Sequence, residues 1–230
     1  MEKLAIDGGN PVRLKNPIVE TDYFTDEELE AVVKVMKSSR IRRGAVTLEY
    51  EKLIAEKLNV KHAIAVTSGT TTLHIAMAAL GIGPGDEVIV TPYTFIASDT
   101  CVLEQNAIPI FADVDPVTLT LDPVDVERKI TKRTKAIIPV SITGTPLNIE
   151  PLMDIAKKHN LYVVEDSAQS LGAKYHGRYE GKYVGTVGHI GSFSTVTGKI
   201  LSTGEGGFVV TDDDDLFDKM WGFQDFGRKR

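Results

Sequence analysis

The stretch Ala63-Ile-Ala-Val-Thr-Ser-Gly-Thr-Thr-Thr-Leu-His-Ile-Ala-Met-Ala-Ala-Leu80 decides the fold class. Its first four residues, 63–66, are a short apolar run of the kind that forms a buried strand. Residues 70–80 repeat apolar side chains at helical spacing, and Gly81 follows as a helix stop. A strand that leads through a short polar turn into a helix is one unit of a parallel α/β sheet.

The same alternation continues along the chain. Further strands are expected at residues 87–91, 108–113, 136–140 and 162–165, and helices at residues 94–105, 123–130 and 149–159. Residues 188–211 differ, because two strands flank a turn that contains Lys199 and no crossover helix separates them. One antiparallel pairing is therefore expected there.

The first sixty residues have a different pattern. Thr25-Asp-Glu-Glu28 precedes an apolar-periodic stretch and predicts a helix start. Residues 48–58 predict a second helix. We therefore divide the chain into an arm with two helices, residues 1–60, and an α/β domain, residues 61–230.

Composition narrows the class of protein. The chain has 230 residues, 42% of them hydrophobic and 25% charged, with a formal net charge of -6. This balance is typical of a soluble globular protein and argues against a nucleic-acid-binding surface. The lone cysteine, Cys101, excludes an internal disulfide and is expected in the core. With neither a membrane-length apolar run nor an apolar signal region after the N-terminal charges, we expect a cytoplasmic protein.

Two charged clusters are expected to be structural. Arg40, Arg42 and Arg43 are interpreted as a solvated helix end rather than an anion site. The acidic run 212–215 directly precedes a helical pattern, which favours a turn and helix start over a metal cluster. No metal site is predicted.

Three groups of residues suggest chemistry. Lys199 offers an amine, Asp166 stands at the end of an apolar strand, and Ser68, Gly69 and Thr70 follow the first strand and open a helix. Backbone N–H groups at a helix start bind phosphate, and ligands of open α/β sheets lie beyond the carboxyl ends of the strands. An amine that forms a Schiff base, a carboxylate for a pyridine nitrogen and a phosphate cradle are the requirements of pyridoxal phosphate (PLP).

Each residue also has a structural interpretation. Lys199 alone would be a solvated lysine, but the glycines 204, 206 and 207 leave room beside it for a flat cofactor. Asp166 and Ser68 could each be a helix cap. Gln169 could bond a phenolic oxygen and Ser194 a phosphate, whereas Glu165 alternates to the other face of the strand and is expected to be structural. Position alone favours core packing for Phe95.

The chain resembles the DegT/DnrJ/EryC1/StrS family of PLP-dependent sugar aminotransferases. The matching stretches occur in order and cover nearly the whole chain: residues 67–76, 83–97, 111–115, 165–173 and 203–207. The resemblance implies the large domain of the aspartate-aminotransferase fold (fold type I), with a mostly parallel seven-stranded sheet and helices on both faces. It also implies a homodimer. Members of the family continue into a C-terminal small domain, and this chain is expected to lack that domain. Two positions depart from the family pattern: Thr195 stands where an aromatic residue is usual, and Ser141 where a histidine is frequent.

The resemblance also assigns roles. Lys199 becomes the residue that bonds the cofactor and moves the proton, Asp166 the partner of the pyridine nitrogen, and Gln169 a contact on the ring substituents. Ser68, Gly69, Thr70 and Ser194 would hold the phosphate. Phe95 falls where the family stacks a side chain on the ring, which replaces the core interpretation.

Three functional hypotheses follow. The first is an aminotransferase that moves an amino group from glutamate or glutamine to a keto-sugar nucleotide or cyclitol. The second is a truncated, non-catalytic remnant that binds PLP or a homologous subunit. The third is an unrelated phosphate- or nucleotide-binding module, which the absence of G-x-G-x-x-G and of a P-loop after the first strand disfavours. Nucleic acid and membrane partners are not expected.

Overall fold

The computed structural model describes residues 3–11 and 24–228. These residues divide into two compact units, one before Ser39 and one from Ser39 onward. The first unit contains the 3-10 helix η1 (Ala5–Asp7) and helix α1 (Asp26–Lys37). Thr25 and Glu28 form the expected capping box, in which the Thr25 N–H donates to Glu28 Oε2 at 2.5 Å. Residues 12–23 of the predicted arm lie outside the described residues.

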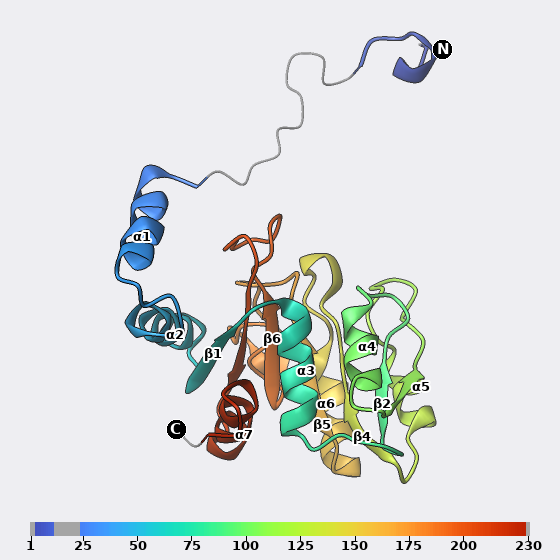
Figure 1. The fold of residues 1–230 in the computed structure, drawn as a ribbon. Helices are drawn as coiled ribbons and strands as arrows, with labels where there is room; N and C mark the ends of the chain where they lie inside the picture. Colours follow the sequence, from blue (N-terminus) through green and yellow to red (C-terminus); the bar gives the residue numbers. More distant parts are fainter. Residues whose placement is uncertain (1–2, 12–23, 229–230) are drawn as a thin grey trace. The chain divides into compact units, whose positions relative to one another are not determined.

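The second unit is an α/β domain around a seven-stranded sheet (Figure 1). The strands follow the order β1-β7-β6-β5-β4-β2-β3. Their bounds are β1 His62–Val66, β2 Glu87–Val90, β3 Ile108–Phe111, β4 Thr134–Ile137, β5 Tyr162–Asp166, β6 Ile190–Ser194 and β7 Gly207–Thr211. The helices are α2 Ala45–Leu58, α3 Gly69–Ala79, α4 Ala97–Leu103, α5 Pro123–Lys129, α6 Ile149–His159 and α7 Asp214–Gln224, with the 3-10 helices η2 Ile142–Gly144 and η3 Gly177–Tyr179.

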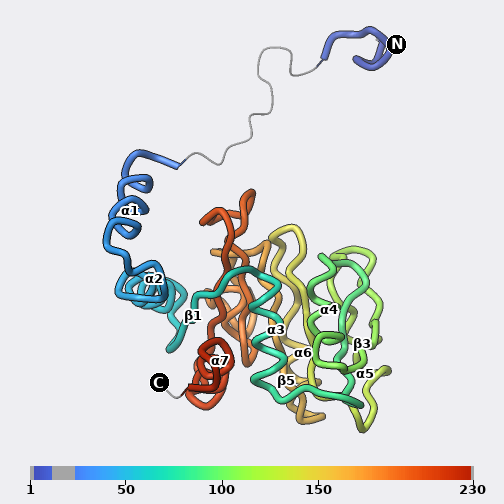
Figure 2. The backbone as a smooth tube through the Cα atoms, viewed as in Figure 1, coloured from blue at the N-terminus to red at the C-terminus, as the bar shows by residue number. Residues whose placement is uncertain are grey.

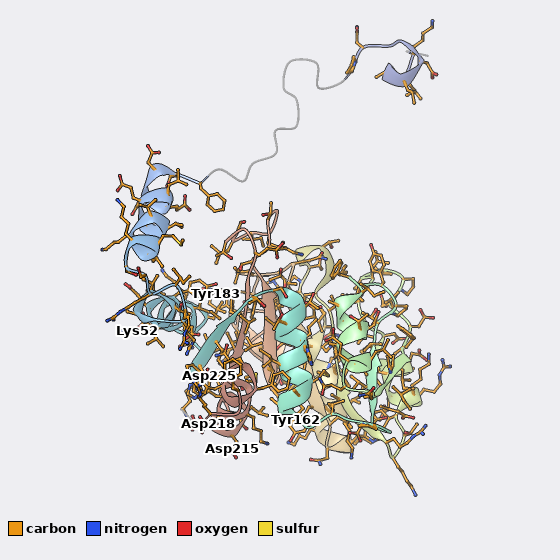
Figure 3. All side chains as sticks on the ribbon, viewed as in Figure 1. Lys52, Tyr162, Tyr183, Asp215, Asp218 and Asp225 are labelled. Carbon is orange, nitrogen blue, oxygen red and sulfur yellow. The ribbon has the colours of Figure 1, made fainter. Side chains whose placement is uncertain are left out.

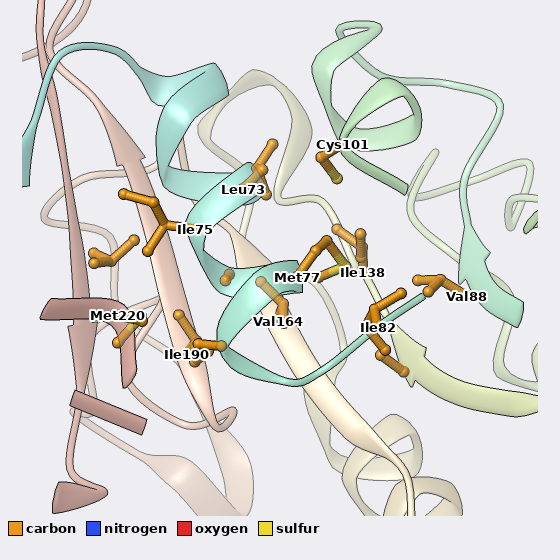
Figure 4. Packing of buried hydrophobic residues seen from close by; sticks show 14 of the residues in the cluster. Leu73, Ile75, Met77, Ile82, Val88, Cys101, Ile138, Val164, Ile190 and Met220 are labelled. Atoms are coloured by element: carbon orange, nitrogen blue, oxygen red, sulfur yellow. The ribbon is translucent and has the colours of Figure 1, made fainter. Parts of the chain in front are cut away.

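Strand alternation assigns side chains to two buried faces. Helices α3, α4 and α7 cover one face, and their apolar residues pack on Val88, Ile138, Val164 and Ile190 (Figure 4). Helices α5 and α6 pack on the intervening residues, such as Val163, and α2 covers the same side near β1 and β7. The chain path in Figure 2 shows these layers without side chains. Because both faces of the central strands are buried, these strands are almost continuously apolar, whereas the edge strand β3 is partly exposed.

The predicted α/β class is confirmed, and the largest difference lies at the sheet edge. The 188–211 segment forms the expected antiparallel pair β6–β7, but β1 also pairs antiparallel with β7. The prediction of one antiparallel pairing was therefore incomplete. A single apolar run such as 63–66 carries no information about the direction of its neighbour, which is set by a strand 140 residues away.

Two boundaries differ for local reasons. The strand expected at residues 136–140 ends at Ile137, because Pro139 has no N–H for the ladder, and Val140 makes an isolated bridge to Asp166. The helix expected at residues 94–105 begins at Ala97. Thr94 instead turns its hydroxyl toward Ser98, with the two oxygens 2.8 Å apart.

The sequence suggested that Arg43 belongs to a solvated helix end, and the structure corrects this. Its guanidinium lies 3.6 Å from the centroid of the Trp221 ring and forms an ion pair with Glu51. Glu51 is buried and also accepts the Ala65 N–H at 2.8 Å. Arg43 therefore ties α2 to α7 and β1, and α2 belongs to the same compact unit as the sheet.

The acidic run behaves as predicted. Asp213 caps α7 by accepting the Leu216 N–H at 2.9 Å, and Asp214 pairs with Lys61 and His62. The exposed acids Asp215 and Asp218 and the half-buried Asp225 belong to the same end of the chain (Figure 3). Within residues 3–11 and 24–228, no group of three or more acidic, histidine or cysteine side chains is placed to hold a metal ion.

Candidate functional site

A cavity of about 300 Å³ lies where several strands reach their carboxyl ends. It is lined by residues that follow β1, β2 and β4 and by the last residues of β5 and β6. All eight predicted site residues line this one cavity, namely Ser68, Gly69, Thr70, Phe95, Asp166, Gln169, Ser194 and Lys199.

The start of α3 forms one wall of the cavity. Ser68 is its N-cap, and its Oγ accepts the Thr71 N–H at 3.1 Å. In the described part of the chain, this cap leaves the N–H groups of Gly69 and Thr70 without a protein acceptor. Gly69 lies directly against Ser194, because a Cβ added to Gly69 would stand 2.6 Å from the Ser194 Cβ. This close approach brings the helix start and the Ser194 hydroxyl to one anion-sized position.

Asp166 forms the buried base of the cavity. Its side chain is 5% exposed, its Oδ2 accepts the Ser98 hydroxyl at 2.6 Å, and its Oδ1 accepts the Ala168 N–H at 3.1 Å. Burial raises the pKa of the Asp166 carboxyl, and the two hydrogen bonds and the charge of Lys199 oppose that rise. Asp166 is the last residue of β5 rather than the first residue after it.

Glu165 points to the opposite face, as expected for its neighbour in a strand. Its carboxylate accepts the N–H groups of Gly185 and Val187, each at 2.7 Å, the N–H of Gly188, and the Tyr175 hydroxyl at 2.6 Å. Four donors on one buried side chain anchor the loop before β6. The structural role expected for Glu165 is confirmed by these contacts.

Lys199 lies on a closed loop between β6 and β7. At the neck of the loop, Thr195 N–H donates to Gly206 O at 2.9 Å and Thr203 N–H to Thr195 O at 2.8 Å. The hydroxyls of Thr195 and Thr203 also pair, 2.7 Å apart, and a Cβ on Gly206 would collide with both. The clamped neck brings Lys199, which is half-buried, to the cavity wall.

Gln169 and Phe95 complete the predicted set. Gln169 Oε1 accepts the Thr143 N–H at 2.8 Å, which leaves its amide NH₂ free to donate. Phe95 is 68% exposed and lies outside any helix, so core packing, the interpretation favoured by position alone, was wrong. An aromatic ring that is exposed at a cavity wall has a face free for stacking.

The comparisons with known proteins now decide the family. The model of the DegT/DnrJ/EryC1/StrS aminotransferase family matches residues 22–230. The chain belongs to this family.

Relatives of the family share about half of their length with this chain. GDP-perosamine synthase from Caulobacter vibrioides is 45% identical over 194 residues, which are 84% of this chain and 51% of that protein. L-glutamine:2-deoxy-scyllo-inosose aminotransferase from Streptomyces kanamyceticus is 39% identical over 225 residues, which are 95% of this chain and 52% of that protein. The X-ray structure of an aminotransferase from Psychrobacter cryohalolentis matches with a TM-score of 0.87 and 42% sequence identity. The match covers 93% of this chain and 54% of the aminotransferase chain.

The DegT/DnrJ/EryC1/StrS family and its solved structures indicate pyridoxal phosphate as the cofactor. The E. coli GDP-4-keto-6-deoxy-D-mannose-3-dehydratase, described with bound hydrated PLP, matches with a TM-score of 0.80 and 28% identity over 87% of this chain and 52% of its own. The cavity suits this group: its volume of about 300 Å³ admits a substituted pyridine, a Cβ-free glycine opens the phosphate position, and a buried carboxylate faces the interior.

Several residues of the candidate site were not predicted from the sequence. Thr94 and Glu205 line the cavity, and the buried Ser98 bonds Asp166 from α4. Thr94 and Glu205 both lie inside stretches that resemble the family, residues 83–97 and 203–207, so their positions were available as a signal. Nothing in the sequence relates Ser98 to a residue 68 positions away, because that contact depends on how α4 packs against α3, β2 and β3.

No helix in the described residues has both the length and the apolar composition required to cross a bilayer.

Proposed function

We propose that the protein is a PLP-dependent aminotransferase that moves an amino group from glutamate or glutamine to a keto group of a sugar nucleotide or cyclitol. The observation that carries the proposal is the single cavity that joins Lys199, the buried Asp166 carboxylate and the start of α3. The names of the relatives support the substrate class: one makes a GDP-linked amino sugar and another aminates an inosose with glutamine.

When bound, PLP supplies an aldehyde that reacts with amines and a ring that accepts electrons from the bonds of the amino carbon. Its phosphate would be held by the N–H groups of Gly69 and Thr70 and by the hydroxyls of Thr70 and Ser194. These residues would hold a dianion at the positive end of the α3 dipole. The helix would therefore fix one end of the cofactor.

Phe95 would offer one face for stacking on the ring. Asp166 would hold the proton of the ring nitrogen at its carboxylate, which keeps the ring positively charged and strengthens its attraction for electrons. The free amide NH₂ of Gln169 would donate to the oxygen on the ring. These contacts would orient the ring relative to Lys199.

Lys199 would carry the proton transfers. Its Nζ must be neutral to attack an aldehyde and to remove the proton from the α-carbon of the donor amino acid. The protonated Nζ would then return the proton to the cofactor side, and one water would be consumed as the keto acid is released. In the second half-reaction the same atom acts in reverse order on the keto substrate.

The test is a half-reaction measured in single turnover. The chain, loaded with PLP, is mixed with L-glutamate or L-glutamine, and the release of the corresponding keto acid is measured. We expect Lys199→Ala to abolish keto-acid release, and Lys182→Ala, which changes a lysine outside the cavity, to retain it. Equal release by Lys199→Ala and the unchanged chain would refute the proposal.

The remnant hypothesis is less well supported than the enzyme. A non-catalytic remnant has no need of an amine, a carboxylate and a phosphate position in one cavity, and the curated relatives named here are enzymes.

We also propose a homodimer in the cytoplasm. The family resemblance supports the dimer, and the buried free thiol of Cys101 is compatible with a reducing compartment. Light scattering of the purified chain tests the dimer.

A further inference from the structure

Ser98 connects α4 to the carboxylate of the candidate site. It lies in the first turn of α4, its side chain is 0% exposed, and its Oγ donates to Asp166 Oδ2 at 2.6 Å. Residues 98 and 166 come from different elements, so this hydrogen bond fixes Asp166 relative to the helix that covers it. Such short bonds to an ionised oxygen are the stronger class of hydrogen bond.

The direction of the hydrogen bonds follows from counting protons. Ser98 Oγ lies 2.6 Å from Asp166 Oδ2, 2.8 Å from Thr94 Oγ1 and 3.2 Å from the Phe95 carbonyl. A hydroxyl has one hydrogen, and an ionised carboxylate is the strongest of these acceptors. Ser98 therefore gives its hydrogen to Asp166, and Thr94 must donate to Ser98.

We propose that Thr94 and Ser98 are positioning residues, a two-hydroxyl relay that keeps the Asp166 carboxylate ionised and fixed in orientation for a pyridine nitrogen. The inference rests on the proposed function, since the pyridine belongs to PLP. Neither residue was assigned a role by sequence. Thr94 lines the cavity, whereas Ser98 is not one of the lining residues and reaches the site through its hydrogen bond to Asp166.

Among the described residues, the carboxylate has one protein donor on each oxygen. Oδ2 accepts from Ser98, and Oδ1 accepts the Ala168 N–H at 3.1 Å. Each oxygen keeps further lone-pair capacity for a ligand. Three other titratable groups interact electrostatically with Asp166. The charge of Lys199, on the loop between β6 and β7, favours the ionised Asp166 carboxylate. Burial and the Asp166 carboxylate raise the pKa of Asp99 and Cys101 on α4.

The first experiment titrates Asp166 directly in the cofactor-free chain. Carbon NMR of protein labelled at the aspartate carboxyls gives the pKa, and Asp166→Asn assigns the signal. We expect Ser98→Ala to raise the pKa of Asp166 by about one to two units, because a hydrogen bond to a charged group is lost. Ser192→Ala is the matched control: it removes an equally buried hydroxyl, whose hydrogen bond goes to Thr72.

A second variant keeps the test decisive if Ser98→Ala does not fold. Thr94→Val preserves shape and removes the hydrogen that Ser98 accepts, so we expect a smaller rise of about half a unit. The relay is overturned if the folded variant changes the pKa of Asp166 no more than Ser192→Ala does.

The second readout uses 4′-deoxypyridoxine 5′-phosphate, which keeps the ring nitrogen and the phosphate but lacks the aldehyde. We expect calorimetry at neutral pH to show about tenfold weaker binding to Ser98→Ala than to Ser192→Ala. Equal affinity for the two variants would overturn the relay. Failure of every variant and the unchanged chain to bind would count against the proposed cofactor, while the NMR titration would still decide the relay.

Discussion

Replacing Glu165 by glutamine tests the strand alternation that positions Asp166. In the structure, Glu165 Oε2 accepts from Tyr175 and Gly185, and Oε1 accepts from Val187 and Gly188. Burial raises the pKa of the Glu165 carboxyl, and these four donors oppose that rise. Glu165→Gln keeps the shape but turns one acceptor into an NH₂ group.

The magnitude follows from the donors that lose their acceptor. The Tyr175 hydroxyl can rotate and accept from the new NH₂ group, but the Gly185 N–H cannot. One orphaned buried N–H costs about 1–3 kcal/mol, and the remaining bonds lose the assistance of a charge. We therefore expect Glu165→Gln to lower the free energy of unfolding by about 2–4 kcal/mol.

Urea unfolding at neutral pH, followed by circular dichroism, measures this change. Glu180→Gln is the control, because Glu180 is an exposed carboxylate paired with His176 in the same part of the chain. We expect the control to change stability by less than about 0.5 kcal/mol. If Glu165→Gln and Glu180→Gln unfold at the same urea concentration, Glu165 is not the buried anchor, and the assignment of Asp166 to the cavity face loses its basis.

Three further predictions address the phosphate position, the lysine loop and acid stability. Gly69→Ala would place a Cβ 2.6 Å from that of Ser194, so fluorescence titration should show about tenfold weaker PLP binding; unchanged affinity would contradict the close packing. Thr195→Val removes the hydroxyl that lies 2.7 Å from Thr203 Oγ1. It should lower the free energy of unfolding by about 1 kcal/mol and speed hydrogen exchange in residues 196–204. Exchange at the wild-type rate would count against a clamped neck of the Lys199 loop. A backbone N–H and two basic side chains lower the pKa of Asp125 to about 2, below its ordinary 3.8. The ionised Asp125 therefore stabilises the fold above pH 3.8, and this stabilisation is lost as the pH falls through about 2. We expect Asp125→Asn to reduce the fall in the free energy of unfolding at acid pH. An unchanged dependence of that free energy on pH would refute this.

The face assignments of the site could be predicted from the sequence because they depend on local periodicity. Two residues apart on β5, Val164 and Asp166 share a face, while Glu165 takes the other. The order of strand, polar turn and helix likewise placed Ser68 and Gly69 at a helix start. The seven-stranded α/β fold and the family were confirmed by the structure and by the comparisons.

The remainder depends on contacts between distant segments. The antiparallel direction of β1 is set by β7, and the position of the half-buried Arg43 is set by Glu51 and Trp221. The contact of Ser98 with Asp166 is a further example. A serine is common at any helix start, and this one reaches Asp166 only because α4 packs against α3, β2 and β3. The roles of the eight cavity residues, and the division at residue 60, stay predictions.

Reduction with borohydride tests the central claim most directly. The purified chain is incubated with PLP, reduced, digested and mapped by mass spectrometry. The account predicts one stable pyridoxyl adduct, on Lys199, that is lost in Lys199→Ala. An adduct that maps to another lysine, or a folded chain that takes up no label at Lys199, would contradict it.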